Sequence, residues 1–373
     1  MCVLTPAKPR CVARWIGLAR LAAFFLAVGG GAVAAEASTS AQADILLQAH
    51  TKAFLQVEHD RARFKETTDG GKASFWTTAE MMEMELDAYE RTADKRQLTL
   101  FTKLFRGFIA AHGSDWSKND FNDDIMWMVI ACTREYLLTG NKEFRDVARS
   151  NFDVCFARAW STNLGGGLWW KTNNRSKNAC VNGPGAIAAV LLSRACREPS
   201  YLAKARDIFL WERARLFDSE TGEVFDNIRL DGRKAYKSFS YNQGTFVGAA
   251  NLLDYTNEAT LAATYTMNRL CEDGLLPAYG ENGDAGGFNG ICVRWIVRFM
   301  KDRRAQPVFE SWLQKNADAA WKVRRPADNL SWCNWLEATP IGSHYAWGCS
   351  SSVVILQVVP PTAALKQDKL NRR

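Results

Sequence analysis

The chain has 373 residues, of which 47% are apolar and 23% are charged, a composition typical of a globular protein with a large core. Its formal net charge is +7, but four of the positive charges lie within residues 1–34. Without them the net charge falls to +3, which excludes an argument for nucleic-acid binding from charge alone.

The first 34 residues have the features of a signal peptide. Basic residues precede a short apolar run at 21–28, and Ala32-Val33-Ala34 fits a signal-peptidase site. The run is too short for a comfortable membrane span, and no cysteine follows it closely enough to carry a lipid. We therefore expect residues 1–34 to be cleaved, and the mature protein to be secreted or periplasmic without a stable membrane anchor.

Eight cysteines follow the signal peptide, and no two of them are spaced as a C-x-x-C pair. This pattern argues against a zinc or redox motif. Export permits disulfides, but most of these cysteines lie in apolar helical runs, where buried free thiols fit equally well. His50, His59 and His112 lie in helical runs without metal-ligand spacing. We therefore expect no metal and no cofactor.

The remainder of the chain is predicted to be a succession of helices within one domain, residues 35–360, followed by a polar tail at 361–373. Thr77 and Glu80 have the spacing of a capping box at the start of the second helix. A β-hairpin is predicted within 223–239, around the turn Asp231-Gly232. The twelve predicted helices are residues 42–67, 77–92, 95–112, 124–139, 142–160, 178–196, 201–217, 243–256, 258–271, 288–301, 306–320 and 347–358.

These helices alternate in character along the chain. The even-numbered ones are the more apolar, and several contain small residues that let neighbouring backbones approach closely, whereas the odd-numbered ones have one charged face. A helix that is apolar on all sides is normally buried. Six buried helices, each followed or preceded by an amphipathic one, predict an all-α fold, an (α/α)6 barrel of six inner and six outer helices.

In such a barrel the inner helices all run in the same direction, so their N-termini gather on one rim. The residues at these predicted starts are mostly aromatic, amide or acidic. Aromatic rings can stack on sugar rings, and amides can bond hydroxyl groups both as donor and as acceptor. The segments at the starts are Phe75-Trp76, Asp123-Asp124, Lys177-Asn178 with Asn182, Tyr241-Asn242-Gln243, Gly287-Phe288-Asn289 and Tyr345-Ala346-Trp347.

Asp123 and Asp124 are the obvious candidates for reaction chemistry. The simplest interpretation is that one is a helix N-cap and the other a first-turn charge favoured by the helix dipole. Glycoside cleavage by a retaining enzyme instead needs two carboxylates about 5–5.5 Å apart. If Asp123 precedes the helix, both side chains can face one cleft. We expect Asp123 to stay ionised as nucleophile and Asp124 to act as acid and base, although residue chemistry alone permits the opposite roles.

These motifs, in this order, resemble glycoside hydrolase family 76, the α-1,6-mannanase family. The resemblance implies an (α/α)6 barrel, an endo-acting retaining mechanism and the aspartate pair as nucleophile and acid/base. Asn122 departs from the aromatic residue often found before the pair. The segments that carry the resemblance are Phe75-Trp76, Ala79-Glu80, Asp123-Asp124 with Trp127, the glycine-rich stretch from Gly165 to Trp170, Lys177-Asn178-Ala179, Asn182-Gly183-Pro184, Tyr241 to Gly244, and Phe288-Asn289-Gly290 with Arg294.

The sequence therefore predicts an exported, monomeric hydrolase whose partner is α-1,6-linked mannan or a manno-oligosaccharide. A transglycosylase that remodels cell-surface glycan remains an alternative, because transfer and hydrolysis share the glycosyl-enzyme intermediate. A non-catalytic carbohydrate-binding protein on the same barrel is a second alternative. The residues predicted to bind substrate are Trp76, Trp170, Asn178, Asn182, Tyr241, Asn242, Gln243, Phe288, Arg294 and Trp347.

Overall fold

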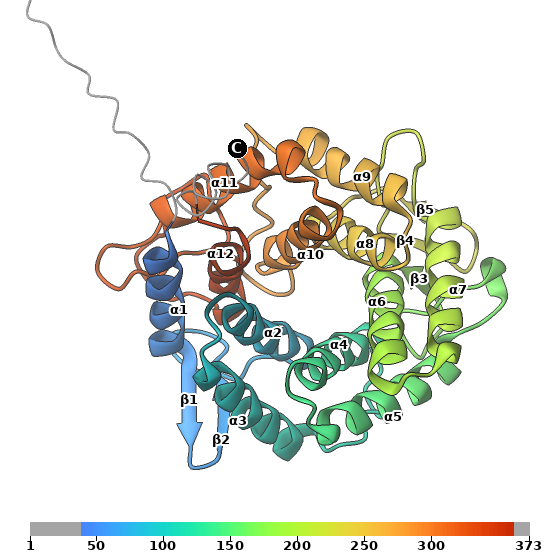
Figure 1. Ribbon diagram of the computed structural model, residues 1–373, viewed down its shortest axis with the longest axis horizontal. Coiled ribbons are helices and arrows are strands. Elements are labelled where there is room, and N and C mark those ends of the chain that lie inside the picture. Colours follow the sequence, from blue (N-terminus) through green and yellow to red (C-terminus); the bar gives the residue numbers. More distant parts are fainter. Residues whose placement is uncertain (1–38, 362–373) are drawn as a thin grey trace, which may run out of the picture. The chain divides into compact units, whose positions relative to one another are not determined.

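The computed structural model describes residues 39–361, so the predicted signal peptide and nearly all of the predicted tail lie outside the described residues. Within this range twelve α-helices form two concentric rings (Figure 1). The inner helices are α2 Phe75–Thr92, α4 Asn122–Thr139, α6 Ala179–Cys196, α8 Ser240–Leu252, α10 Phe288–Arg303 and α12 Ala346–Val358. The outer helices are α1 Ser40–Phe54, α3 Lys95–His112, α5 Lys142–Ala159, α7 Pro199–Arg215, α9 Thr256–Tyr265 and α11 Gln306–Lys322.

The inner ring is closed. Each inner helix contacts the next, and α12 returns to contact both α10 and α2. Small residues permit this spacing: a Cβ atom on Gly244 of α8 would lie 2.5 Å from the Cα atom of Cys292 in α10. Helix α6 is apolar and long enough to cross a membrane, but 83% of it is buried, as expected of a core helix. The predicted (α/α)6 barrel is confirmed.

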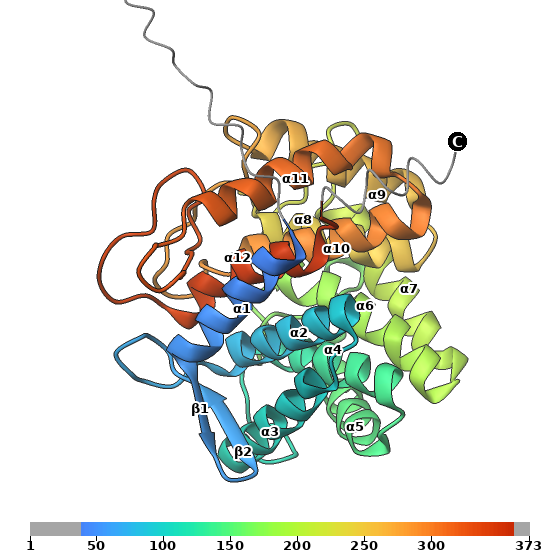
Figure 2. The same cartoon turned by 60° about the vertical axis from the view of Figure 1, so that its left-hand side comes forward.

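The prediction of a first helix over residues 42–67 is wrong for the second half of that range. Helix α1 ends at Phe54, and the chain then forms a hairpin of β1 Leu55–Glu58 and β2 Arg61–Phe64 (Figure 2). In β2, Ala62 and Phe64 are buried whereas the two arginines are exposed, a period of two that the helical interpretation overlooked. The hairpin packs on α3, where the Ala62 carbonyl lies so close to Gly107 that a Cβ atom there would clash.

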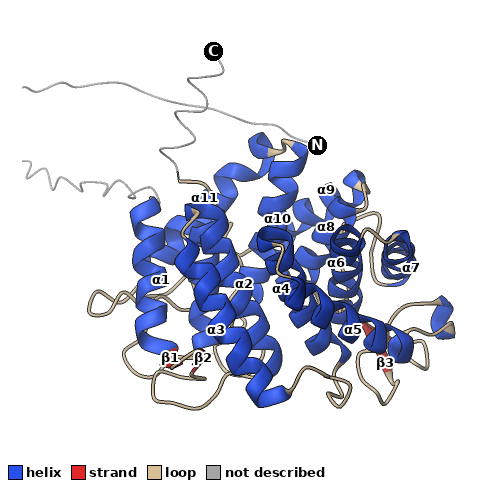
Figure 3. Cartoon of the chain, turned by 60° about the horizontal axis from the view of Figure 1, so that its bottom comes forward, coloured by secondary structure: helices blue, strands red, loops and turns tan. Residues whose placement is uncertain are grey.

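A second small sheet flanks the start of α6. Strand β4 Asn227–Arg229 pairs with β5 Lys234–Ala235 around the Asp231-Gly232 turn, so the predicted hairpin is confirmed. The unpredicted strand β3 Ser176–Asn178 pairs with β4 on its other side, and Asn178 lies opposite Asn227. Helices otherwise dominate the described chain, apart from its loops (Figure 3). This sheet carries several residues to the end of the barrel at which the inner helices begin.

The starts of α2 and α4, which position the site, differ from the prediction. The N-cap of α2 is Ser74, and the side chain of Thr77 bonds to Ser74 while that of Glu80 bonds to Arg294, so the predicted capping box does not form. Helix α4 begins at Asn122, two residues earlier than predicted. Asp123 is therefore helical. Helix α9 continues into a short π-helix, η2 Thr266–Leu270.

Candidate active site

A cleft of about 580 Å³ opens at the end of the barrel where the inner helices begin. It receives side chains from the starts of α2, α4, α6, α8 and α10, as predicted, and from the loops and strands between them. The residues that line it are Ser74, Trp76, Phe121, Asp123, Asp124, Trp127, Trp170, Ser176, Asn178, Cys180, Asp226, Asn227, Arg229, Phe239, Tyr241, Asp284 and Phe288.

The acid pair lies in the first turn of α4, and both aspartates line the cleft. The N-cap is Phe121, which has no polar side-chain group, so neither aspartate is the N-cap. The expectation that Asp123 would lie before the helix is therefore wrong, yet both carboxylates still reach one cleft. The positive end of α4 favours negative charge on either of them.

Asp123 has an enclosed environment. Burial raises the pKa of its carboxyl to about 8, and the neighbouring charge of Asp124 adds to the shift. The indole N–H of Trp170 and the thiol of Cys180 face this carboxyl and oppose the shift. Within residues 39–361, the Asp123 Oδ1 atom and the Trp170 Nε1 atom are both buried without a hydrogen-bond partner of good geometry.

Asp124 is the more hydrated member of the pair. Burial raises the pKa of its carboxyl to about 6. The Asn119 Nδ2 atom donates to Asp124 Oδ2 over 2.9 Å, which favours the ionised form, and the charge of Lys171 acts in the same direction. The order of the two pKa values is therefore the reverse of the order expected from the sequence, because burial of Asp123 outweighs the helix dipole.

Aromatic rings form one wall of the cleft. Tyr241 and Phe288 stack with ring centroids 3.8 Å apart, and the Trp76 ring lies 6.4 Å from Phe288. The Trp76 Nε1 atom donates to Asp284 Oδ1 over 3.1 Å, which fixes the indole. Trp170 packs edge-on against Phe121 on the side of the acid pair. Flat apolar faces beside carboxylates are suited to binding sugar rings.

The predicted substrate-binding residues fall into two groups. Trp76, Trp170, Asn178, Tyr241 and Phe288 line the cleft, as expected. The structure places the other five behind the cleft or elsewhere in the barrel. Those five are Asn182, Asn242, Gln243, Arg294 and Trp347.

The three amides of this second group bond to protein groups around the cleft. Asn182 bonds both the N–H and the carbonyl of Leu168, which ties α6 to the glycine-rich loop. Gln243 accepts a bond from the N–H of Val224 over 2.7 Å. Asn242 donates to Asp226 Oδ1 over 3.2 Å. All three side chains are fully buried, and bonds to the backbone account for the amides of Asn182 and Gln243. Within residues 39–361 the Asn242 Oδ1 atom has no hydrogen-bond partner, so protein bonds account for only one end of that amide.

Arg294 and Trp347 are also placed differently from the prediction. Arg294 is only 5% exposed and pairs with Glu80 and Asp87, whose oxygens lie 2.6 and 2.7 Å from its guanidinium. It borders a separate cavity at the opposite, C-terminal end of the inner helices. Trp347 packs edge-on against Trp76 and donates to the Asp284 carbonyl, and so supports the aromatic wall from behind.

Several residues of the cleft were not predicted from the sequence, chiefly Asp226 and Asp284. Burial raises the pKa of Asp226, which bonds Asn227 and Asn242. Asp226 immediately precedes β4, and Asp284 lies in the loop before α10. Loop residues carry no helical periodicity, so only the hairpin prediction could have drawn attention to Asp226.

A closed (α/α)6 barrel whose helix starts surround a carboxylate pair and sugar-sized aromatic faces defines a glycoside hydrolase. The chain belongs to glycosyl hydrolase family 76, whose family model matches residues 35–370. The resemblance found in the sequence is thereby confirmed. No curated protein sequence matches the chain.

Solved structures agree with this membership. The α-1,6-mannanase of a Salegentibacter species is 30% identical, with a TM-score of 0.79 over 85% of this chain and 98% of that one. A Listeria innocua protein is 26% identical, with a TM-score of 0.79 over 88% and 97% of the two chains. A Chaetomium thermophilum protein solved with glucosamine is 16% identical, with a TM-score of 0.70 over 85% and 88%, and shares the fold.

Proposed function

We propose that the protein hydrolyses α-1,6-mannosidic linkages within mannan by a retaining double displacement that uses Asp123 and Asp124. The observation that carries this proposal is a pair of adjacent carboxylates, both with raised pKa values, in an aromatic-lined cleft. A Salegentibacter α-1,6-mannanase with two aspartates, neighbours in its sequence, replaced by asparagine is described as inactive and as bound to α-1,6-mannotriose. That variant supports both the residues and the substrate.

The mechanism needs one carboxylate and one carboxylic acid at the start of the cycle. The carboxylate attacks C1 of the mannosyl residue while the acid protonates the departing glycosidic oxygen. Water then attacks C1 of the glycosyl-enzyme, and the former acid, now a carboxylate, accepts a proton from that water. With pKa values of about 8 and about 6, the pair holds one proton near neutral pH, which is the required state.

We assign Asp123 as the nucleophile and Asp124 as the acid and base. The unpaired indole N–H of Trp170 and the positive end of α4 both stabilise a carboxylate at Asp123. The two carboxyls titrate as a pair, and catalysis with these roles requires their shared proton to lie on Asp124 when the sugar is bound.

The proposal is tested by incubating the mature protein with debranched α-1,6-mannan and sizing the products over time. Internal cleavage should give a ladder of manno-oligosaccharides, whereas α-1,2- and α-1,3-linked manno-oligosaccharides should remain intact. Products longer than the starting oligosaccharide would instead indicate transglycosylation. Binding of mannan without any change in its length would indicate a carbohydrate-binding protein.

The same proposal includes export, because mannan is an extracellular polymer. Residues 1–34 are proposed to direct secretion and then to be removed. Intact-mass measurement of the protein recovered from the periplasm or the medium tests this. A mass equal to that of residues 35–373 would support it, and recovery of the full-length chain from the cytoplasm alone would contradict it.

A further inference from the structure

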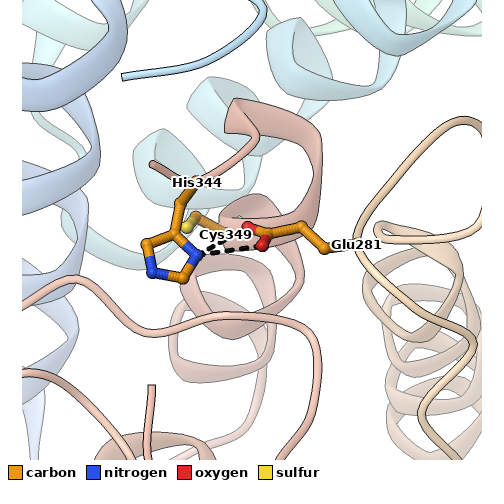
Figure 4. A group of neighbouring side chains, drawn as sticks. All are labelled: Glu281, His344 and Cys349. Carbon is orange, nitrogen blue, oxygen red and sulfur yellow. Dashed lines mark hydrogen bonds and ion pairs between the residues drawn. The ribbon is translucent and has the colours of Figure 1, made fainter. Parts of the chain in front are cut away.

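Three donor side chains of different types meet behind the aromatic wall. They are Glu281 from the loop before α10, His344 from the loop before α12, and Cys349 from the first turns of α12 (Figure 4). One donor atom from each lies within 4.8 Å of the other two. The His344 Nδ1 atom lies 2.9 and 3.0 Å from the two Glu281 oxygens. The side chains of His344 and Glu281 are 3% and 13% exposed, and Cys349 is 1% exposed.

We propose that Glu281, His344 and Cys349 form a binding site for a zinc-type divalent transition-metal ion. Thiolate, imidazole and carboxylate are the three ligand types that zinc takes from proteins. Tetrahedral bonds of 2.0–2.3 Å separate neighbouring donor atoms by roughly 3.3–3.7 Å. Donor atoms that already lie within 4.8 Å of one another reach this geometry with shifts on the order of 1 Å.

The surroundings of two ligands favour metal binding. The His344 Nε2 atom lies 2.8 Å from the Pro340 carbonyl, so Nε2 carries a proton and donates, which leaves Nδ1 to face the other two donors. The backbone N–H of Tyr345 donates to Glu281 Oε1 over 2.9 Å and orients that carboxylate. Hydrogen bonds of this kind to the far side of the ligands are the usual support of a zinc site.

The charge balance also permits a buried ion. A divalent ion bound by a cysteine thiolate, a glutamate carboxylate and a neutral imidazole forms a cluster of zero net charge. The loaded site would therefore leave no unpaired charge among these buried groups.

The site would clamp the wall of the cleft. Glu281 lies three residues before Asp284, which bonds the Trp76 and Trp347 indoles. A metal ion would fasten this loop to the beginning of α12. The sequence alone did not indicate the site, because its ligands come from two loops and a helix, and Glu281 and His344 are 63 residues apart.

The test uses tag-free mature protein that has been treated with a chelator, reduced, loaded with Zn²⁺ and desalted. We expect one zinc per chain by elemental analysis and a higher melting temperature than that of the metal-free protein. Loading with Co²⁺ should give a thiolate-to-cobalt charge-transfer band in the near ultraviolet. These readouts do not depend on mannan hydrolysis, so the metal site and the proposed function can fail separately.

Variants identify the ligands. Cys349→Ser should abolish the cobalt band, and His344→Ala or Glu281→Gln should lower the bound zinc at least tenfold. Cys292→Ser, which changes another fully buried thiol in inner helix α10, should keep both signals. If Cys349→Ser does not fold, Glu281→Gln provides the same test with a conservative change. Zinc content no higher than that of a chelated blank, or a disulfide between Cys349 and the buried Cys333, would overturn the proposal.

Discussion

Asp123 and Asp124 are neighbours in the chain but differ in solvation, and this difference should separate their kinetic roles. Asp123→Asn should abolish turnover, because no glycosyl-enzyme can form. Asp124→Asn should slow substrates with poor leaving groups by roughly 100- to 10,000-fold, because only these need a proton from the acid. With an activated leaving group, azide should rescue the Asp124 variant by replacing the water that lacks a base. Rescue of the Asp123 variant alone would show that the roles are reversed.

The pH dependence of the wild type reports the same pair. Burial raises both pKa values, to about 6 and about 8, so kcat/KM should follow a bell whose limbs lie near those values. Below the lower limb both acids are protonated and there is no nucleophile. Above the upper limb both are ionised and there is no acid. A flat profile from pH 5 to pH 9 would contradict this assignment. The Asp124→Asn variant, assayed with an activated leaving group, should lose the alkaline limb because it has no acid to ionise.

Trp76 is predicted to stack on a sugar rather than to stabilise the core. It lines the cleft, and Trp76→Ala should lower kcat/KM on α-1,6-mannan by roughly 10- to 100-fold, with a change in stability of less than about 1 kcal/mol. Trp335→Ala is the matched control, because that indole is 2% exposed. It should cost about 3–5 kcal/mol of unfolding free energy with little effect on kinetics of the folded enzyme. A large loss of stability in Trp76→Ala with normal kinetics of the folded enzyme would show that Trp76 is a core residue.

At the scale of the helices, a buried ion network joins α2 to α10 and α4. Arg294 pairs with Glu80 and Asp87, and Arg134 of α4 pairs with the same Asp87 and with Glu83. Removing one partner leaves buried carboxylates without compensation. Such networks explain how strongly charged residues can face the inside of an apolar barrel.

Arg294→Ala should therefore destabilise the protein by about 3–5 kcal/mol, measured by urea unfolding at pH 7, while the folded variant keeps its KM for mannan. Arg298→Ala in the same helix is the control, since its pair with Asp302 is half exposed and should contribute less than about 1 kcal/mol. If Arg294→Ala instead raises the KM for mannan and leaves stability unchanged, Arg294 binds substrate, as the sequence predicted.

The alternation of apolar and amphipathic helices predicted the inner and outer rings, because burial on all sides leaves a strong compositional signal in an inner helix. The β1–β2 hairpin was missed because four-residue strands give too few positions for a period of two to stand out. Asn182 and Gln243 lie near the starts of α6 and α8 but are buried behind the cleft. They were predicted to bind substrate because sequence does not distinguish an amide that bonds a sugar from one that bonds backbone. Glu281 and His344 lie in different loops, before α10 and α12, and come into contact only because these two helices are neighbours in the closed ring.

At the scale of the whole molecule, the two carboxyl groups in the cleft affect the stability of the fold. Burial makes the ionised form of each carboxyl unfavourable. An unperturbed Asp has a pKa of about 4, whereas Asp123 and Asp124 have folded-state values of about 8 and about 6. The folded protein thus binds more protons than the unfolded chain between pH 4 and pH 8, and the contribution of the pair to stability is lost as the pH rises through that window. The two buried aspartates therefore lower the free energy of unfolding near neutral pH.

Asp123→Asn and Asp124→Asn should therefore raise the melting temperature, by about 2 °C or more at pH 8, because an amide avoids the desolvation of a charge. The advantage over the wild type should shrink as the pH falls and vanish below about pH 4, where the wild-type acids are protonated in both states. Asp218→Asn is the control of opposite sign: the N–H of Glu220 lowers the pKa of Asp218, so that variant should lose stability at neutral pH. Parallel melting curves of wild type and pair variants across this range would mean that the two carboxylates are solvated, and that the proton shared by the pair is absent.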